Sequence, residues 1–175
     1  MELLRILRHA YSAELAAAIA YRGHWRSLPE GADRSRIREI EREEWAHRED
    51  VGVMLAALGG RPGVWGEIRA GLIGGALAAL CHVAGRLAPM YGAGFLESGN
   101  VGEYERAALL ARTAGREDFV ERLLEMAEVE WEHEHFFRSR VEAHPWGRRL
   151  PIWRSPPPKE TIRGSQRLQP VGAER

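Results

Sequence analysis

The residues of this sequence best able to do chemistry form two Glu-x-x-His motifs. Glu44 precedes His47 by three positions, and Glu130 precedes His133 by the same spacing. Residues three apart lie on one side of an α-helix, so each Glu and His can reach a common point. Both pairs interrupt stripes that are otherwise apolar, and a buried carboxylate persists only when a positive partner compensates for it. The spacing therefore predicts that each pair binds a metal ion.

Two further glutamates stand alone in the apolar stripes of other predicted helices. Glu14 lies in the first of these helices, and Glu97 lies in a later one. The order along the chain is Glu, Glu-x-x-His, Glu, Glu-x-x-His, which is the ligand pattern of dinuclear centres in ferritin-like bundles. The predicted metal ligands are Glu14, Glu44, His47, Glu97, Glu130 and His133.

The last motif overlaps a second pair with the same spacing, Glu132 and His135. A chain rich in Glu also produces such pairs by chance on solvated helix faces, so a single motif is a weak indication. Helical steps back from Glu132 reach three more glutamates, whereas steps back from Glu130 reach apolar residues. We therefore expect Glu130 and His133 to point inward and His135 to lie at the surface.

Length and composition set the broad class. A chain of 175 residues supports one domain with a core, and a net charge of zero gives no reason to expect nucleic-acid binding. The single cysteine, Cys81, excludes an intrachain disulfide and a thiolate iron site. No leader pattern opens the chain, and the longest apolar run, 70–81, is too short to span a bilayer. These features favour a cytoplasmic protein.

Helical periodicity and turn signals predict an all-α fold, a ferritin-like four-helix bundle over residues 1–143. The stretch between its second and third helices must return along the bundle, and it carries an extra short helix. Three of the expected helices cover about residues 2–27, 65–84 and 87–114. A further helix runs from a cap at Asp33 or Ser35 to residue 58, and the last runs from residue 117 to near His144. Residues 144–175 are rich in Pro and Arg and are expected to be an extended or disordered tail.

At these motifs the chain resembles the demethoxyubiquinone hydroxylase family, ferritin-like di-iron monooxygenases of ubiquinone synthesis. The resemblance covers about residues 8–142. The family's first helix has a ligand Glu followed by Tyr, Gly and Gln at fixed spacings, and this chain differs only in the last. The corresponding residues are Glu14, Tyr21, Gly23 and His24. The second-helix motif, the turn at 57–62 and the Gly-rich apolar stretch after it also match.

The resemblance implies two iron ions, with manganese as the alternative. Glu44 and Glu130 would bridge them, with one further Glu and one His completing each ion. It also implies an oxygen-activating oxidoreductase, a hydroxylase of an apolar or aromatic, quinone-like substrate. Its partners would be dioxygen or peroxide and an external electron donor. A His-Tyr pair that is thought to help electron transfer in the family is replaced here by Glu103 and Tyr104, which become the candidate catalytic residues.

Two other functions remain open on the sequence alone. One is a ferritin- or rubrerythrin-like ferroxidase or peroxidase without an organic substrate, and the other is a non-catalytic metal-binding bundle. A hydroxylase needs an apolar pocket, which we expect beside the glycines Gly92, Gly94, Gly99 and Gly102. Its mouth would be lined by Leu72, Ile73, Leu77 and Leu80, which suit a peripheral contact with the inner face of the membrane. A homodimer is compatible with the same pattern.

Overall fold

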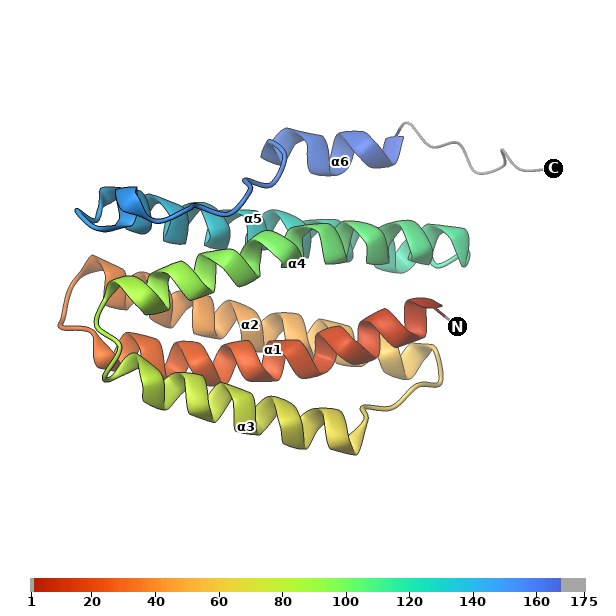
Figure 1. The fold of residues 1–175 in the computed structure, drawn as a ribbon. Coiled ribbons are helices and arrows are strands. Elements are labelled where there is room, and N and C mark those ends of the chain that lie inside the picture. Colours follow the sequence, from red (N-terminus) through yellow and green to blue (C-terminus); the bar gives the residue numbers. More distant parts are fainter. Residues whose placement is uncertain (1, 168–175) are drawn as a thin grey trace. The chain divides into compact units, whose positions relative to one another are not determined.

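The computed structural model describes residues 2–167 and is helical, without strands, in that part of the chain (Figure 1). The contacts divide the chain into two compact units, Met1–Pro89 and Met90–Arg175. The boundary falls in the first turn of α4 (Leu87–Thr113). The expectation of an all-α protein is confirmed for the described residues.

The first unit contains three helices, α1 (Glu2–Ser27), α2 (Ala32–Ala57) and α3 (Val64–Cys81), with α1 packed against both of the others (Figure 1). The buried positions of α1 and α2 recur every three or four residues, as an amphipathic pattern requires. The two helices are antiparallel, because Leu4 at the start of α1 adjoins Gly60 just beyond the end of α2. Gly59 has a φ of 68° there, which favours glycine at the turn that ends α2.

The third helix runs parallel to α1 along its length. Near its start Glu67 accepts a hydrogen bond from the Ser12 hydroxyl at 2.6 Å. Towards its end Ala78 fills the space beside Gly23, where a Cβ would lie 2.4 Å from the Ala78 Cα. Gly23 is therefore needed for this close approach of two backbones. The chain therefore runs back along the unit in α3, from the C-terminus of α2 toward the level of its N-terminus.

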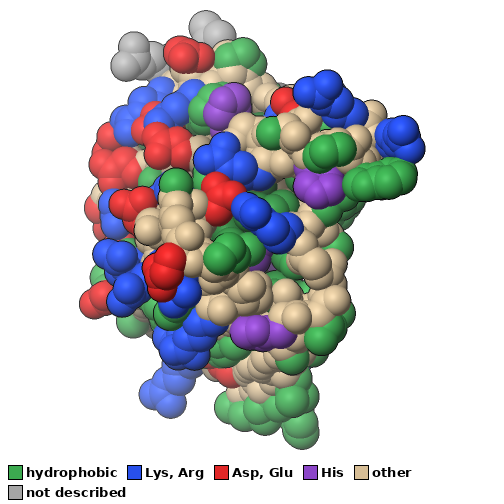
Figure 2. All heavy atoms as spheres, turned by 90° about the vertical axis from the view of Figure 1, so that its left-hand side faces the viewer, with side chains coloured by type: hydrophobic (Ala, Val, Ile, Leu, Met, Phe, Trp, Pro, Cys, Tyr) green, Lys and Arg blue, Asp and Glu red, His purple; other side chains and the backbone are tan. Residues whose placement is uncertain are grey.

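Most large apolar side chains of α3 face outward. The helix is 18 residues long with a mean hydropathy of 1.3, so by length and composition it could cross a membrane. Only 11% of this stretch is buried. The apolar run that the sequence shows, 70–81, is too short to cross a membrane, but the helix that contains it begins six residues earlier. Figure 2 shows hydrophobic side chains gathered at the lower edge of the face that it draws. The exposed residues are Val64, Trp65, Ile68, Leu72, Ile73, Leu77 and Leu80.

The second unit is built on an antiparallel hairpin of α4 and α5 (Glu117–Ala143). Gly115, with a φ of 70°, turns the chain between them. The pairing is visible in the neighbours of α4, where Gly94 adjoins Phe137 and Asn100 bonds to Glu130. The apolar stripes of both helices are buried at the positions that the periodicity predicts.

The segment after α5 contains a short 3₁₀ helix, η1 (Gly147–Arg149), and a final helix, α6 (Lys159–Arg167). The expectation of an extended or disordered tail was wrong for α6, because ion pairs to α5 and the burial of Ile162 hold this short helix in place. Residues 151–158 have no regular secondary structure. Residues 168–175 of that tail lie outside the described part.

Candidate metal centre

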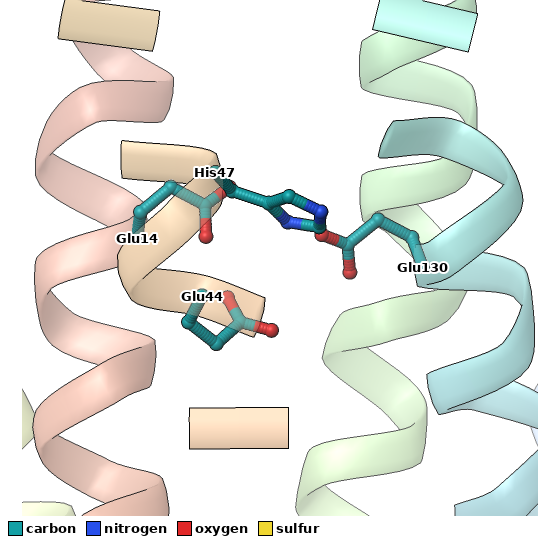
Figure 3. Close-up of side chains that lie close together, drawn as sticks. All are labelled: Glu14, Glu44, His47 and Glu130. Atoms are coloured by element: carbon teal, nitrogen blue, oxygen red, sulfur yellow. The ribbon is translucent and has the colours of Figure 1, made fainter. Parts of the chain in front are cut away.

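The first unit gathers three of the predicted ligands in one cluster. Glu14 comes from α1, and Glu44 and His47 come from α2; all three side chains leave their helices toward the same space (Figure 3). One ligand atom of each lies within 4.8 Å of those of the other two. All three residues are buried, with Glu44 fully so. The antiparallel hairpin of α1 and α2 brings them together across 30 positions of sequence.

The second unit repeats this arrangement with the other three. Glu97 comes from α4, and Glu130, which projects from α5 in Figure 3, is joined by His133 one helical turn further on. Their ligand atoms also lie within 4.8 Å of one another, and all three are at most 1% exposed. The His133 Nδ1 atom is 3.6 Å from Glu130 Oε2. Each hairpin therefore holds one Glu and one Glu-x-x-His motif.

Asn100 is a candidate site residue that the motifs in the sequence do not include. Its Nδ2 group donates a hydrogen bond to Glu97 Oε2 at 2.9 Å and lies 3.4 Å from Glu130 Oε2. The amide thus connects a carboxylate of α4 with one of α5. Its position three residues after Glu97, on the same side of the helix, is the signal that could have identified it.

One turn before Glu44, a further buried carboxylate on α2 is bound by side chains of α1. Glu41 accepts hydrogen bonds from Arg22 Nε at 2.7 Å and from Trp25 Nε1 at 2.6 Å. Burial opposes its ionisation, but the bonds from Trp25 and Arg22 outweigh this and hold the pKa of Glu41 below its usual value. Glu41 is therefore a charged, fully engaged group that fixes α2 against α1, and it is not part of the cluster.

The other residues singled out from the sequence lie outside both clusters. Tyr104 is buried and Glu103 half-buried on α4, and their catalytic role stays a prediction. His24 is buried near the end of α1, where burial lowers its pKa to about 4 against the opposing charge of Asp33. His135 is exposed and stacks on Trp131 with a centroid distance of 4.9 Å, whereas His133 is buried in the cluster, as the apolar register predicts.

The donor set of each cluster fits a divalent transition metal. Two carboxylates and one imidazole suit Fe²⁺ and Mn²⁺ and lack the thiolates that structural zinc sites commonly use. Both clusters are buried among aliphatic residues of their own helices, where carboxylates are stable when they coordinate a cation. The structure thus holds buried Glu and His groups that could bind metal in each unit.

Comparison of the chain with protein-family models, with curated proteins and with solved structures gives no match.

Proposed function

We propose that the two clusters are the halves of one dinuclear iron centre in a ferritin-like four-helix bundle. The observation that carries the proposal is the repetition of the same buried donor set, one Glu and one Glu-x-x-His, in two antiparallel hairpins of one chain. Such a repeat is the ligand arrangement of carboxylate-bridged dinuclear sites. The parallel return of α3 along α1 supports the long connection that this topology needs between its second and third helices.

In this proposal each residue type has a defined task. The four carboxylates, Glu14, Glu44, Glu97 and Glu130, supply four negative charges, which balance two divalent ions. The imidazoles of His47 and His133 add one neutral donor on each side. Asn100 orients two of these carboxylates, because its Nδ2 group donates a hydrogen bond to Glu97 and lies 3.4 Å from an oxygen of Glu130. The aliphatic surroundings limit the access of water.

The reaction that we propose is oxygen activation, in the first place the hydroxylation of an apolar or aromatic substrate. Two iron(II) ions, held by these carboxylates and imidazoles, would supply two electrons to dioxygen. Hydroxylation consumes one dioxygen, two electrons and two protons, and it yields the hydroxylated substrate and water, so an external donor must reduce the iron again. The donor set supports oxygen chemistry in general, and the resemblance to the hydroxylase family favours the organic substrate.

The decisive test for the metal centre is the coupling between its two ions. Protein loaded with Mn²⁺ should bind close to two ions per chain and show the exchange-coupled multiline EPR signal of a dinuclear site. Glu44→Gln and Glu130→Gln should each abolish this signal. Two independent six-line signals, each lost with one unit's variant alone, would show two separate mononuclear sites.

Oxygen uptake by the iron(II)-loaded protein separates the two enzyme classes. A hydroxylase should consume dioxygen faster when a quinol or another apolar aromatic compound is present and should release its hydroxylated form. Uptake driven by iron(II) alone, and indifferent to every organic compound, would instead assign the protein to iron oxidation.

We also propose that the exposed face of α3 contacts a membrane surface. Trp65 at its start is 83% exposed, and indole rings favour the interface between lipid and water. The one acidic residue of α3, Glu67, is turned inward to Arg48 and Ser12, so the outward face carries only Arg69 as a charge. The protein should co-sediment with anionic vesicles, and Leu72→Ser should weaken this binding. Val53→Ser, at an exposed position of α2, is the control and should leave it unchanged.

A further inference from the structure

An indole from the C-terminal segment fills a space between α4 and α5. The Trp153 side chain is 8% exposed, and its ring lies against Gly94, where a Cβ would be 2.3 Å from Cζ2 of the indole. Tyr91 meets the ring edge-on with a centroid distance of 5.2 Å. Gly94 therefore leaves a slot that is shaped for a flat aromatic ring.

The slot contains one directional polar group. Trp153 Nε1 donates a hydrogen bond to the buried Glu134 Oε1 at 2.7 Å. Arg138 holds this carboxylate, with its Nε 2.8 Å from the same oxygen, and lies over the indole at 5.0 Å from the ring centroid. A slot with one fixed acceptor at the edge of the ring selects rings that carry an N–H or O–H group.

The slot adjoins the metal cluster of the second unit. Gly94 lies three residues before Glu97 on α4, which corresponds to a rise of about 4.5 Å along the helix. Glu134 follows His133 directly on α5. A ring in this slot therefore lies about one helical turn from the cluster.

Apart from the buried side chains of Trp153 and Ile162, the contacts that hold the C-terminal segment to α5 lie at the surface. Residues 151–158 have no regular secondary structure, and Trp131 Nε1 donates to the Pro157 carbonyl at 3.0 Å. Beyond them Lys159 pairs with Glu132, and Arg163 pairs with two further glutamates of α5. Ion pairs between partly exposed side chains add little to stability and weaken as salt is added.

We propose that Trp153 is a displaceable plug in a binding site for a flat aromatic molecule with an N–H or O–H donor. When the segment 150–167 lifts, such a molecule replaces the indole against Gly94 and donates its proton-bearing group to Glu134. The use of this site for substrate rests on the proposed function, and its ability to bind a ring does not.

Indole and 1-methylindole are the matched probes, because only indole can donate to Glu134. Calorimetric titration of the full-length protein, metal-free and loaded with Mn²⁺, should show indole binding more tightly than 1-methylindole in both forms. Lys159→Glu combined with Arg163→Glu repels the segment from α5 and raises the open fraction, so the apparent affinity for indole should rise about tenfold. Arg154→Glu is the control, since this exposed residue has no ion pair in the part that the structure describes.

Hydrogen exchange should report the displacement directly. Amides of residues 150–164 should exchange faster when indole is added to the wild-type protein, while those at the centre of α5 should not. The proposal is overturned if wild-type protein binds no indole at any salt concentration and only Trp153→Ala does, because Trp153 would then be a fixed core residue. Equal binding of the two probes would overturn the role of Glu134. Failure of the dinuclear centre would change none of these results.

Discussion

Asn100 connects the two helices of the second hairpin through a single amide. Because its Nδ2 donates to Glu97 and approaches Glu130, the amide limits the rotation of both carboxylates. Groups in this position around a metal site commonly affect affinity almost as strongly as the ligands themselves.

Asn100→Ala should therefore weaken the binding of Mn²⁺ by about 10- to 100-fold. Competition with a chromophoric chelator measures this affinity. Ser98→Ala is the matched control, because within the described residues the Ser98 hydroxyl bonds only to the backbone oxygen of Phe95 on the same helix. An unchanged affinity in Asn100→Ala would remove the amide from the metal site.

His24 should make the protein less stable in mild acid. Burial is the main cause of its low pKa, about 4 against an ordinary 6.5, while Asp33 opposes the shift. Because the folded pKa is the lower one, protonation favours the unfolded state. The contribution of neutral His24 is complete above about pH 6.5 and is lost as the pH falls toward 4.

His24→Gln removes this titration while keeping a polar side chain of similar size. Between pH 7.5 and 4.5 the wild-type protein should lose about 2 to 3 kcal/mol more of its free energy of unfolding than the variant does. Urea denaturation at both pH values gives this difference, in which the titration of other groups cancels. Equal losses would mean that His24 is protonated without cost in the folded protein.

Along α4 the glycines serve different purposes. Gly94 is buried where Trp153 and Phe137 leave no room for a Cβ, whereas Gly92, Gly99 and Gly102 are exposed. The expectation that all four border a pocket thus finds a structural basis only at Gly94, where Trp153 occupies the space.

Gly94→Ala and Gly99→Ala should shift stability in opposite directions. At position 94 the new methyl group would lie 2.3 Å from the indole and 3.0 Å from the Phe137 Cβ, which should cost about 1 to 3 kcal/mol through overpacking. At position 99 the exposed alanine should stabilise the helix by about 0.5 to 1 kcal/mol. Equilibrium denaturation of both variants measures the pair, and stabilisation by Gly94→Ala would contradict the packing of Trp153.

At the scale of the whole molecule, the proposed centre would couple the folding of two units, each of which is compact by its internal contacts. Each hairpin contributes half of the proposed ligand set. Two bound metal ions would therefore stabilise the folded state of both units together. This coupling distinguishes one shared centre from two clusters that bind separately.

Metal-loaded protein should therefore unfold in one transition, and metal-free protein in two transitions or a broader one. At free Mn²⁺ about 100-fold above its dissociation constant, the stabilisation should be about 2.7 kcal/mol. Scanning calorimetry with and without a chelator gives both quantities. A chelator that leaves the number and the position of the transitions unchanged would argue against metal that joins the units.

The sequence by itself determined the helices and the six candidate ligands. Helical periodicity is local, so it predicted α5 from 117 to near His144, where the structure has Glu117–Ala143, and α3 at 65–84, where the structure has Val64–Cys81. Polar residues in an apolar stripe stand out for the same reason, which is why Glu14 and Glu97 were recognisable without any partner in view.

Only the tertiary structure decided what packs beside these ligands. The bond from Asn100 reaches a residue 30 positions away, and Trp153 fills the slot at Gly94 from 59 positions away, distances at which no periodicity applies. The composition of the C-terminal segment predicted disorder because it measures the segment's own hydrophobicity. It contains no information on the glutamates of α5 or on the space beside Gly94. These supply the contacts that order the segment.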